Sequence, residues 1–274
     1  MLRDDYGDDA EWRPTLKTHA DYVAELRAQG PEVPHHICGV ESLRRGSVCI
    51  GTKHTVLSGV ASHVIANTLC EICDESMPGP NQNARMKELD KVLQKWYKDT
   101  KEQYRMPGHL EWNKLRQSGD WPCLVAQAAQ TRHLSKFAEY LADEYNTGTQ
   151  HDQLRLACTK LLVRFYSVLE NEPRWMTKTG QTELRNISRT FQNVYNQLSI
   201  EALNNNLRRW KRIPKFHFFM HLCEHQNVLN PRATWVYADE DFQKLTKTAA
   251  KSLHPLTVDQ NTLYKWVIDH FDVD

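Results

Sequence analysis

Three long segments with apolar residues at helical spacing constrain the fold of this chain more than any other feature. They cover residues 122–145, 150–170 and 181–203. In each segment, apolar side chains recur every three or four positions, which places them on one face of an α-helix. Each apolar face is wide enough to form the inner surface of a bundle. The pattern predicts a mainly α-helical protein built around a helical bundle.

Further helices are expected on both sides of this bundle. A nearly uncharged apolar stretch at 55–77 predicts a buried helix, and 84–104 predicts a charged amphipathic helix. Shorter helices are expected at 15–29, 216–226, 238–252 and 259–271. The β-prone run around Val48 and the aromatic run around Trp235 predict one or two short strands.

Charge and composition narrow the classes of function. The 274 residues carry a formal net charge of +1, so any affinity for nucleic acid must come from local patches. No apolar run is expected to span a bilayer, and the acidic N-terminus is unlike a signal peptide. We therefore expect a soluble protein of the nucleus or cytoplasm with no membrane partner. The seven scattered cysteines are expected to be reduced thiols, several of them in the core.

The densest basic run of the chain lies at residues 208–215, beside two aromatic side chains, Trp210 and Phe216. Its cations are Arg208, Arg209, Lys211, Arg212 and Lys215. Cations beside stacking surfaces are typical of contacts with single strands or with a duplex backbone. The alternative is a solvated helix end, where cations complement the helix dipole. The run is the candidate nucleic-acid site, with DNA as the candidate partner.

Three histidines lie on one predicted helix face, at positions 217, 221 and 225. Within them, His221, Glu224 and His225 match H-x-x-E-H, the inverted zinc-protease pattern. In that pattern two histidines bind zinc and the glutamate acts as a base. A zinc metallohydrolase is therefore one alternative function, although a third ligand is needed and no downstream motif supplies it. The other interpretation is packed or solvated histidines.

A single C-x-x-C pair, Cys70 and Cys73, lies inside the predicted buried helix. A structural zinc site needs two more ligands, for which His54 and His63 are the upstream candidates. Free cysteines also behave as small buried apolar groups. Both interpretations remain open from the sequence.

An acidic triplet, Asp239, Glu240 and Asp241, follows an aromatic pair near the C-terminus. Carboxylates at a helix start often only complement the helix dipole. One of them is alternatively a ligand for Mg²⁺, which proteins usually hold through one or two carboxylates.

Several of these motifs together resemble a known family. The segments 213–222 (IPKFHFFMHL), 230–232 (NPR) and 237–242 (YADEDF) resemble the C-terminal part of DDE transposases of eukaryotic cut-and-paste transposons, namely the CACTA type and its relatives. The segment 49–69 resembles the strand-to-helix segment of the same family. The resemblance extends over roughly residues 31–253 and implies an RNase H-like catalytic domain carrying a helical insertion.

The resemblance also implies where catalytic acids belong. Glu240 matches the last metal-binding acid, whereas the middle acid falls on Gly51. DDE chemistry needs acids from three places to hold two metal ions, and glycine offers no ligand. We therefore expect a truncated, catalytically inactive derivative that needs no cofactor, with Mg²⁺ relevant only to residual activity. A helical protein-interaction module without a nucleic-acid role is the alternative from another class.

The same resemblance divides the chain into four segments. Residues 1–30 form an acidic tail and first helix, and 31–80 a remnant of the RNase H-like core. Residues 81–207 correspond to the all-helical insertion. Residues 208–274 hold the basic run and the vestigial acidic segment. The expected strands would be what remains of the RNase H-like sheet.

Overall fold

The computed structural model describes residues 49–115, 121–224 and 228–235, together with a few single positions near either end. The chain divides into two compact units, Met1–Thr234 and Trp235–Asp274. The sequence-level divisions at residues 80 and 207 fall inside the first of these units. Three predicted helices lie largely or wholly outside the described residues, namely 15–29, 238–252 and 259–271. The acidic triplet at 239–241 also lies outside them.

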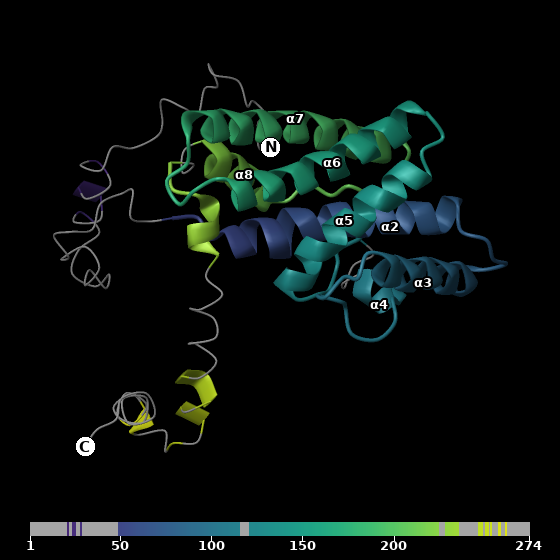
Figure 1. The fold of residues 1–274 in the computed structure, drawn as a ribbon, viewed down its shortest axis with the longest axis horizontal. Helices are drawn as coiled ribbons and strands as arrows, with labels where there is room; N and C mark the ends of the chain where they lie inside the picture. The colour runs from purple at the N-terminus through teal and green to yellow at the C-terminus, as the bar shows by residue number, and fades with distance from the viewer. Residues whose placement is uncertain are drawn as a thin grey trace. The chain divides into compact units, whose positions relative to one another are not determined.

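Helices dominate the described part of the first unit, which confirms the mainly α-helical fold (Figure 1). They are η3 (Lys53–Ala61), α2 (Ser62–Glu75), α3 (Gln82–Asp99), α4 (Trp112–Leu115), α5 (Ala128–Glu144), α6 (Gln150–Asn171), α7 (Lys178–Asn204), α8 (Pro214–Glu224) and η4 (Pro231–Thr234). No strand is formed within the described residues. Cys49, Ile50 and Trp235 have no regular structure there, and Val48 lies outside them.

The helix predicted at 55–77 is the centre of the bundle. It begins as the π-type helix η3, kinks at Ser58 and continues as α2. The stretch Lys53–Glu75 is long and apolar enough to cross a membrane, which corrects the expectation that no run reaches that length. Within the fold, 94% of its 18-residue apolar window is buried. A helix that is apolar all round is typical of a protein core, where neighbours cover every face.

The remaining long helices surround this central helix. Figure 1 shows α6 and α7 on one side of α2, with α3 and α4 on the other. Helix α5 packs against α6, α2 and η3, while α8 packs against α7 and η3. Aromatic side chains join α6, α7 and α8, because the Phe219 ring lies edge-on to both Phe165 and Phe191, at centroid distances of 5.1 and 5.4 Å.

Local chemistry explains where the helices begin and end. Asn81, Thr149 and Thr177 each accept a backbone N–H three residues ahead, and so cap α3, α6 and α7. Helix α5 begins at Ala128, six residues after its predicted start. The amides of 123–125 instead donate to Leu115, Ser62 and Lys114 carbonyls, at 2.7–3.0 Å. Tertiary pairing therefore overrides the helical pattern in this segment.

Candidate nucleic-acid interface and the polar network beneath it

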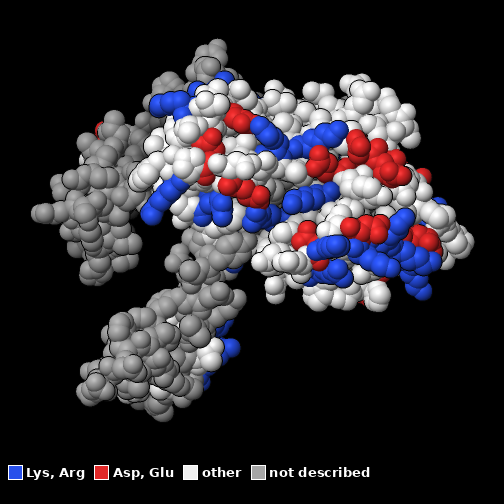
Figure 2. All heavy atoms as spheres, viewed as in Figure 1, with Lys and Arg blue, Asp and Glu red and all other residues white. Residues whose placement is uncertain are grey.

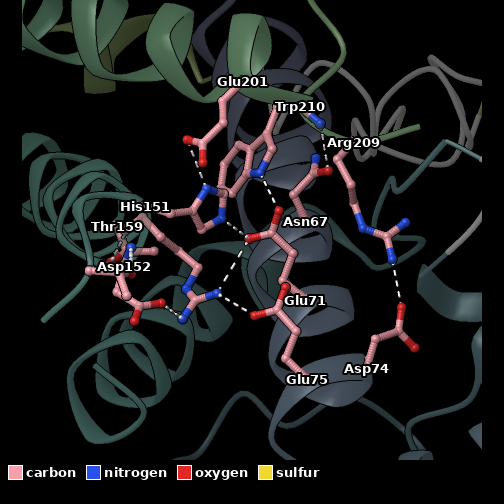
Figure 3. A network of polar contacts seen from close by, with 12 residues as sticks. Asn67, Glu71, Asp74, Glu75, His151, Asp152, Thr159, Glu201, Arg209 and Trp210 are labelled. Carbon is pink, nitrogen blue, oxygen red and sulfur yellow. Dashed lines mark hydrogen bonds and ion pairs between the residues drawn. The ribbon is translucent and has the colours of Figure 1, made fainter. Parts of the chain in front are cut away.

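A buried carboxylate on α2, Glu71, anchors a polar network between α2, α6, α7 and the segment after α7 (Figure 3). Glu71 is only 5% exposed. Its Oε1 accepts the Trp210 Nε1–H at 2.5 Å, and its Oε2 accepts from His151 Nε2 at 3.0 Å. A carboxylate this deep in a fold needs such partners, because burying an unpaired charge is costly.

His151, in the first turn of α6, lies between two carboxylates. Its Nδ1 is 3.1 Å from Glu201 Oε2, while its Nε2 faces Glu71. The hydrogen bond with Glu71 raises the pKa of His151 to about 9, against the opposing effect of burial. The imidazole is therefore a cation at neutral pH and links α2 to α7 through α6.

Arg155, one turn further along α6, is 1% exposed and completes the network. Its Nη2 donates to Asp152 at 2.5 Å, and its Nη1 lies 3.5 Å from both Glu71 and Glu75. Burial, reinforced by the charge of Glu71, raises the pKa of Glu75. Two cations from one helix thus pair with the buried carboxylates of Glu71 and Asp152 and with the more exposed ones of Glu75 and Glu201.

The network fixes the basic run. We call residues 207–213 the strap, because this segment crosses α2 between α7 and α8. The Trp210 side chain is fully buried, and its backbone N–H donates to Asn67 Oδ1 at 2.7 Å. Its φ of 52° is uncommon for a bulky residue, so the surrounding contacts must hold it there. Arg209 donates to Asp74 Oδ2 at 2.6 Å, further along α2.

The cations predicted to bind nucleic acid therefore have different environments. Arg208 and Lys211 are exposed, and Arg209 and Arg212 are partly exposed. The Lys211 ammonium lies 5.7 Å from the centre of the Trp121 ring. Lys215 donates to the Ser58 carbonyl at 2.9 Å. The prediction that Trp210 offers a stacking surface is wrong, because its side chain lies in the core. Nucleic-acid contact by this run remains a prediction.

The zinc-protease motif lies partly outside the described residues, so the metallohydrolase interpretation stays a prediction. His217 and His221 point toward each other, with 2.8 Å between their Nε2 atoms. Glu224, the base of the predicted motif, is 7% exposed and accepts from Arg189 Nε at 2.9 Å. His225 lies outside the described residues. Within the part of the chain that the structure describes, no three or more His, Cys, Asp or Glu side chains are arranged to hold a metal ion, at the Cys70 and Cys73 pair or elsewhere.

Of the two positions matched to transposase acids, only Gly51 lies within the described residues. Glu240 lies outside the described residues, so its distance from Gly51 is not defined. The segment of Gly51 is held next to η4, because the Thr52 hydroxyl donates to Pro231 O at 2.8 Å. The Thr234 hydroxyl in turn donates to Ile50 O at 3.2 Å. A Cβ added at Gly51 would meet its nearest atom, His54 Nδ1, at 3.6 Å, so the backbone has room for a side chain.

A second group of cations lies on α3. Its members are Lys87, Lys91, Lys95 and Lys98, all exposed, at i, i+4, i+8 and i+11 along the helix. We call this group the lysine stripe. Figure 2 shows lysine and arginine atoms gathered over the region of α3, with acidic atoms beside them. The spacing is visible in the sequence, on the face of the predicted helix opposite its apolar residues.

No family model, no curated protein and no solved structure matches this chain. We therefore infer its function from the contacts, burial and charges of the described residues, together with the motif resemblance.

Proposed function

We propose that this chain is a transposase-derived helical domain that has no strand-cleaving activity and contacts nucleic acid through its exposed cations. The lysine stripe of α3 is the observation that supports this proposal most directly. The strap, with its exposed Arg208 and Lys211, is the second contact. Asp74 links the strap to α3, because its side chain binds Arg209 and its backbone carbonyl accepts from Arg85.

The geometry of the stripe suits a polymer of phosphates. From Lys87 to Lys98 the helix rises about 16 Å, with neighbouring cations one turn apart. Nucleic acid carries about one negative charge per 3.4 Å of each strand in a duplex. A strand lying along the helix therefore offers each lysine a phosphate, and released counterions supply the driving force.

Acidic neighbours on α3 only partly offset these charges. Glu88 pairs with Lys91 at 2.7 Å. Asp90 is 7% exposed and accepts from the backbone N–H of Leu110, so it faces the interior. Within the described residues, Lys91 alone among the four lysines takes part in an ion pair. The stripe is thus a cationic surface set in a chain of balanced charge.

Order in the strap favours binding in a different way. Buried Trp210 and the Arg209 contact hold the backbone in one conformation before any ligand arrives. Exposed cations on an ordered segment lose little additional backbone entropy on binding. The strap therefore adds to the affinity for nucleic acid, most of which comes from the lysine stripe.

The absence of catalysis follows from the residue at position 51. Two-metal cleavage needs several carboxylates, and Gly51 supplies none. We expect the purified protein to leave supercoiled plasmid intact in the presence of Mg²⁺ or Mn²⁺. Nicking that disappears in Glu240→Ala would contradict this part of the proposal.

Binding is tested with fluorescent single-stranded and double-stranded oligonucleotides at several salt concentrations. Four phosphate contacts predict that log K falls with log salt with a slope between about −3 and −4. Reversing three lysines of the stripe, in Lys87→Glu/Lys95→Glu/Lys98→Glu, should weaken binding more than tenfold and flatten the slope. Reversing Arg208 and Lys211 should have a smaller effect in the same direction.

A matched control separates the stripe from net charge. Lys136→Glu/Lys178→Glu/Arg185→Glu changes three exposed cations on α5 and α7, and gives the same net charge as the stripe variant. The proposal expects this control to bind nearly as the parent does. Equal weakening by both variants would mean that only overall charge matters, and salt-independent or absent binding would refute the proposed function.

A protein-interaction module is the second candidate, and one observation favours it. Ile200 and Leu203 near the end of α7, and Leu207 at the start of the strap, are 50%, 74% and 55% exposed. Exposed apolar side chains close together are typical of protein contact sites. Under this alternative, changing Leu203 and Leu207 to serine would abolish a protein complex while nucleic-acid binding, if any, would be unaffected.

A further inference from the structure

A cavity of about 770 Å³ opens between α3 and the segment 109–113. This volume lies within the range of small-molecule sites in proteins, about 300–1,000 Å³. Its apolar floor includes Met86 and Leu110, which are 3% and 2% exposed. Lys87 and Lys91, the first two members of the lysine stripe, also line it. The cavity is thus continuous with the cationic surface.

The segment beside the cavity is firmly positioned. Lys114 Nζ donates to the carbonyls of Pro107 and His109, at 2.6 and 2.7 Å. The Tyr97 hydroxyl accepts the backbone N–H of Met106 at 3.1 Å. A site needs walls that keep their places, and these bonds hold the loop to α3 and to itself.

An aspartate–histidine pair lies in the wall. Asp90 Oδ2 is 2.7 Å from His109 Nδ1, and Asp90 Oδ1 accepts the Leu110 N–H at 2.8 Å. Burial acts to raise the pKa of Asp90, but the bonds from Leu110 and His109 outweigh it and lower that pKa. The Asp90 carboxylate orients the imidazole by accepting a hydrogen bond from His109 Nδ1. His109 Nε2 is left for a hydrogen bond with a ligand, on a side chain that is 77% exposed.

The remaining polar groups of the cavity have complementary chemistry. Asn83 and Asn113 contribute side-chain amides, which both donate and accept. Asn113 Nδ2 donates to Glu111 at 3.1 Å, so the Asn113 side-chain oxygen can accept a hydrogen bond from a ligand. The half-buried indole of Trp112 supplies an aromatic surface. Stacking on an aromatic ring combined with amide and imidazole hydrogen bonds is the chemistry by which proteins hold unstacked bases.

We propose that this cavity binds a planar nitrogen heterocycle of the nucleobase kind, stacked on Trp112 and hydrogen-bonded to His109 Nε2. Lys87 and Lys91 contact the phosphate attached to it. The same chemistry fits a free nucleotide and a base within a single strand. For the strand, this inference rests on the proposed function and adds to it a preference for unpaired bases.

Mononucleotides test the cavity without the rest of the stripe. Isothermal titration of the full chain with AMP, CMP, GMP and UMP should give saturable binding to at least one of them. Indole N–H signals in NMR spectra, assigned with Trp112→Phe, should show the Trp112 resonance shifting on addition of that nucleotide. His109→Ala should weaken its binding about tenfold, since the exposed imidazole can be removed without opening the core.

His133→Ala is the matched control. His133 pairs with Glu102 at 2.8 Å and stacks on Tyr104, and it does not line the cavity. Its removal should leave nucleotide affinity unchanged. Equal affinity of His109→Ala and the parent, or competition by inorganic phosphate as effective as that by the nucleotide, would overturn the base site. If His109→Ala does not fold, Asn113→Ala provides a second lining variant, for which a severalfold loss is expected.

Abasic strands separate this inference from the proposed function. An oligonucleotide whose bases are removed retains its phosphates, so it still binds the lysine stripe but not the cavity. The inference expects a normal strand to bind more tightly than its abasic counterpart, with the difference lost in His109→Ala. Mononucleotide binding without strand binding would indicate a free nucleotide as the ligand and would refute only the proposed function. Equal binding of normal and abasic strands, with no mononucleotide binding, would refute only the cavity.

Discussion

The strongest test of the architecture is the removal of one charge, in Glu71→Gln. Glu71 receives the Trp210 indole N–H and His151, and lies 3.5 Å from Arg155. The amide retains one oxygen that accepts a hydrogen bond, but it loses the negative charge that balances the two cations of α6. Its NH₂ group would also face existing donors. The substitution therefore disturbs the network while changing the side-chain volume very little.

The expected magnitude follows from burial and from the partners that remain. Breaking a buried ion pair by removing one partner costs about 3–5 kcal/mol. The His151 side chain is 24% exposed and retains Glu201, while Arg155 retains Asp152, so the loss is reduced. We expect Glu71→Gln to lower the free energy of unfolding by about 2–4 kcal/mol. Glu75→Gln, at a side chain 58% exposed, should change it by about 0–1 kcal/mol.

Urea denaturation followed by far-UV circular dichroism measures both variants at pH 7. A double-mutant cycle with His151→Ala gives the coupling, which we expect to be about 1–3 kcal/mol for groups in direct contact. A loss below about 1 kcal/mol in Glu71→Gln, or one equal to that of Glu75→Gln, would refute the view that a buried network holds the strap.

Three further predictions concern the same network. The folded pKa of His151 is about 9 and its usual value 6.5, so its contribution is complete below pH 6.5 and is lost as pH rises to 9. Urea titration across this pH window measures the stability difference between the parent and His151→Gln. That difference should shrink by up to about 3 kcal/mol as the pH rises, and a constant difference would contradict a raised pKa for His151. Trp210→Phe keeps an aromatic ring but removes the donor to Glu71, so thermal denaturation should show a loss of about 1–3 kcal/mol. Reversing the charge of either Arg209 or Asp74 should lower the stability by about 1 kcal/mol or less. Exchanging the two charges in one variant should restore most of that loss, and no recovery would argue against the ion pair.

The helices were largely predictable because local patterns determine them. The apolar period predicted α6 and α7 to within three residues at each end, and it identified the helix at 55–77 as buried. The start of α5 was six residues out, because the amides of 123–125 pair with α2 and the end of α4. No local pattern contains that information.

The candidate site was less predictable, for two different reasons. The lysine stripe depends only on spacing within one helix, so the sequence contains its full signal. The role of the basic run could not be inferred in the same way. Glu71 and Trp210 are 139 positions apart, and Glu71 and His151 are 80 apart. Which of the cations become anchors and which remain exposed depends on these long-range contacts.

The sequence by itself determined that this chain forms amphipathic helices around one apolar helix, because side-chain periodicity and capping residues act over a few positions. Only the tertiary structure decided that Glu71 becomes the centre of a charged interior, that Trp210 is buried rather than available for stacking, and that Asp90 orients His109 beside a cavity. Those outcomes depend on which helices meet and on the desolvation of charges at their contacts. Both are properties of the assembled bundle.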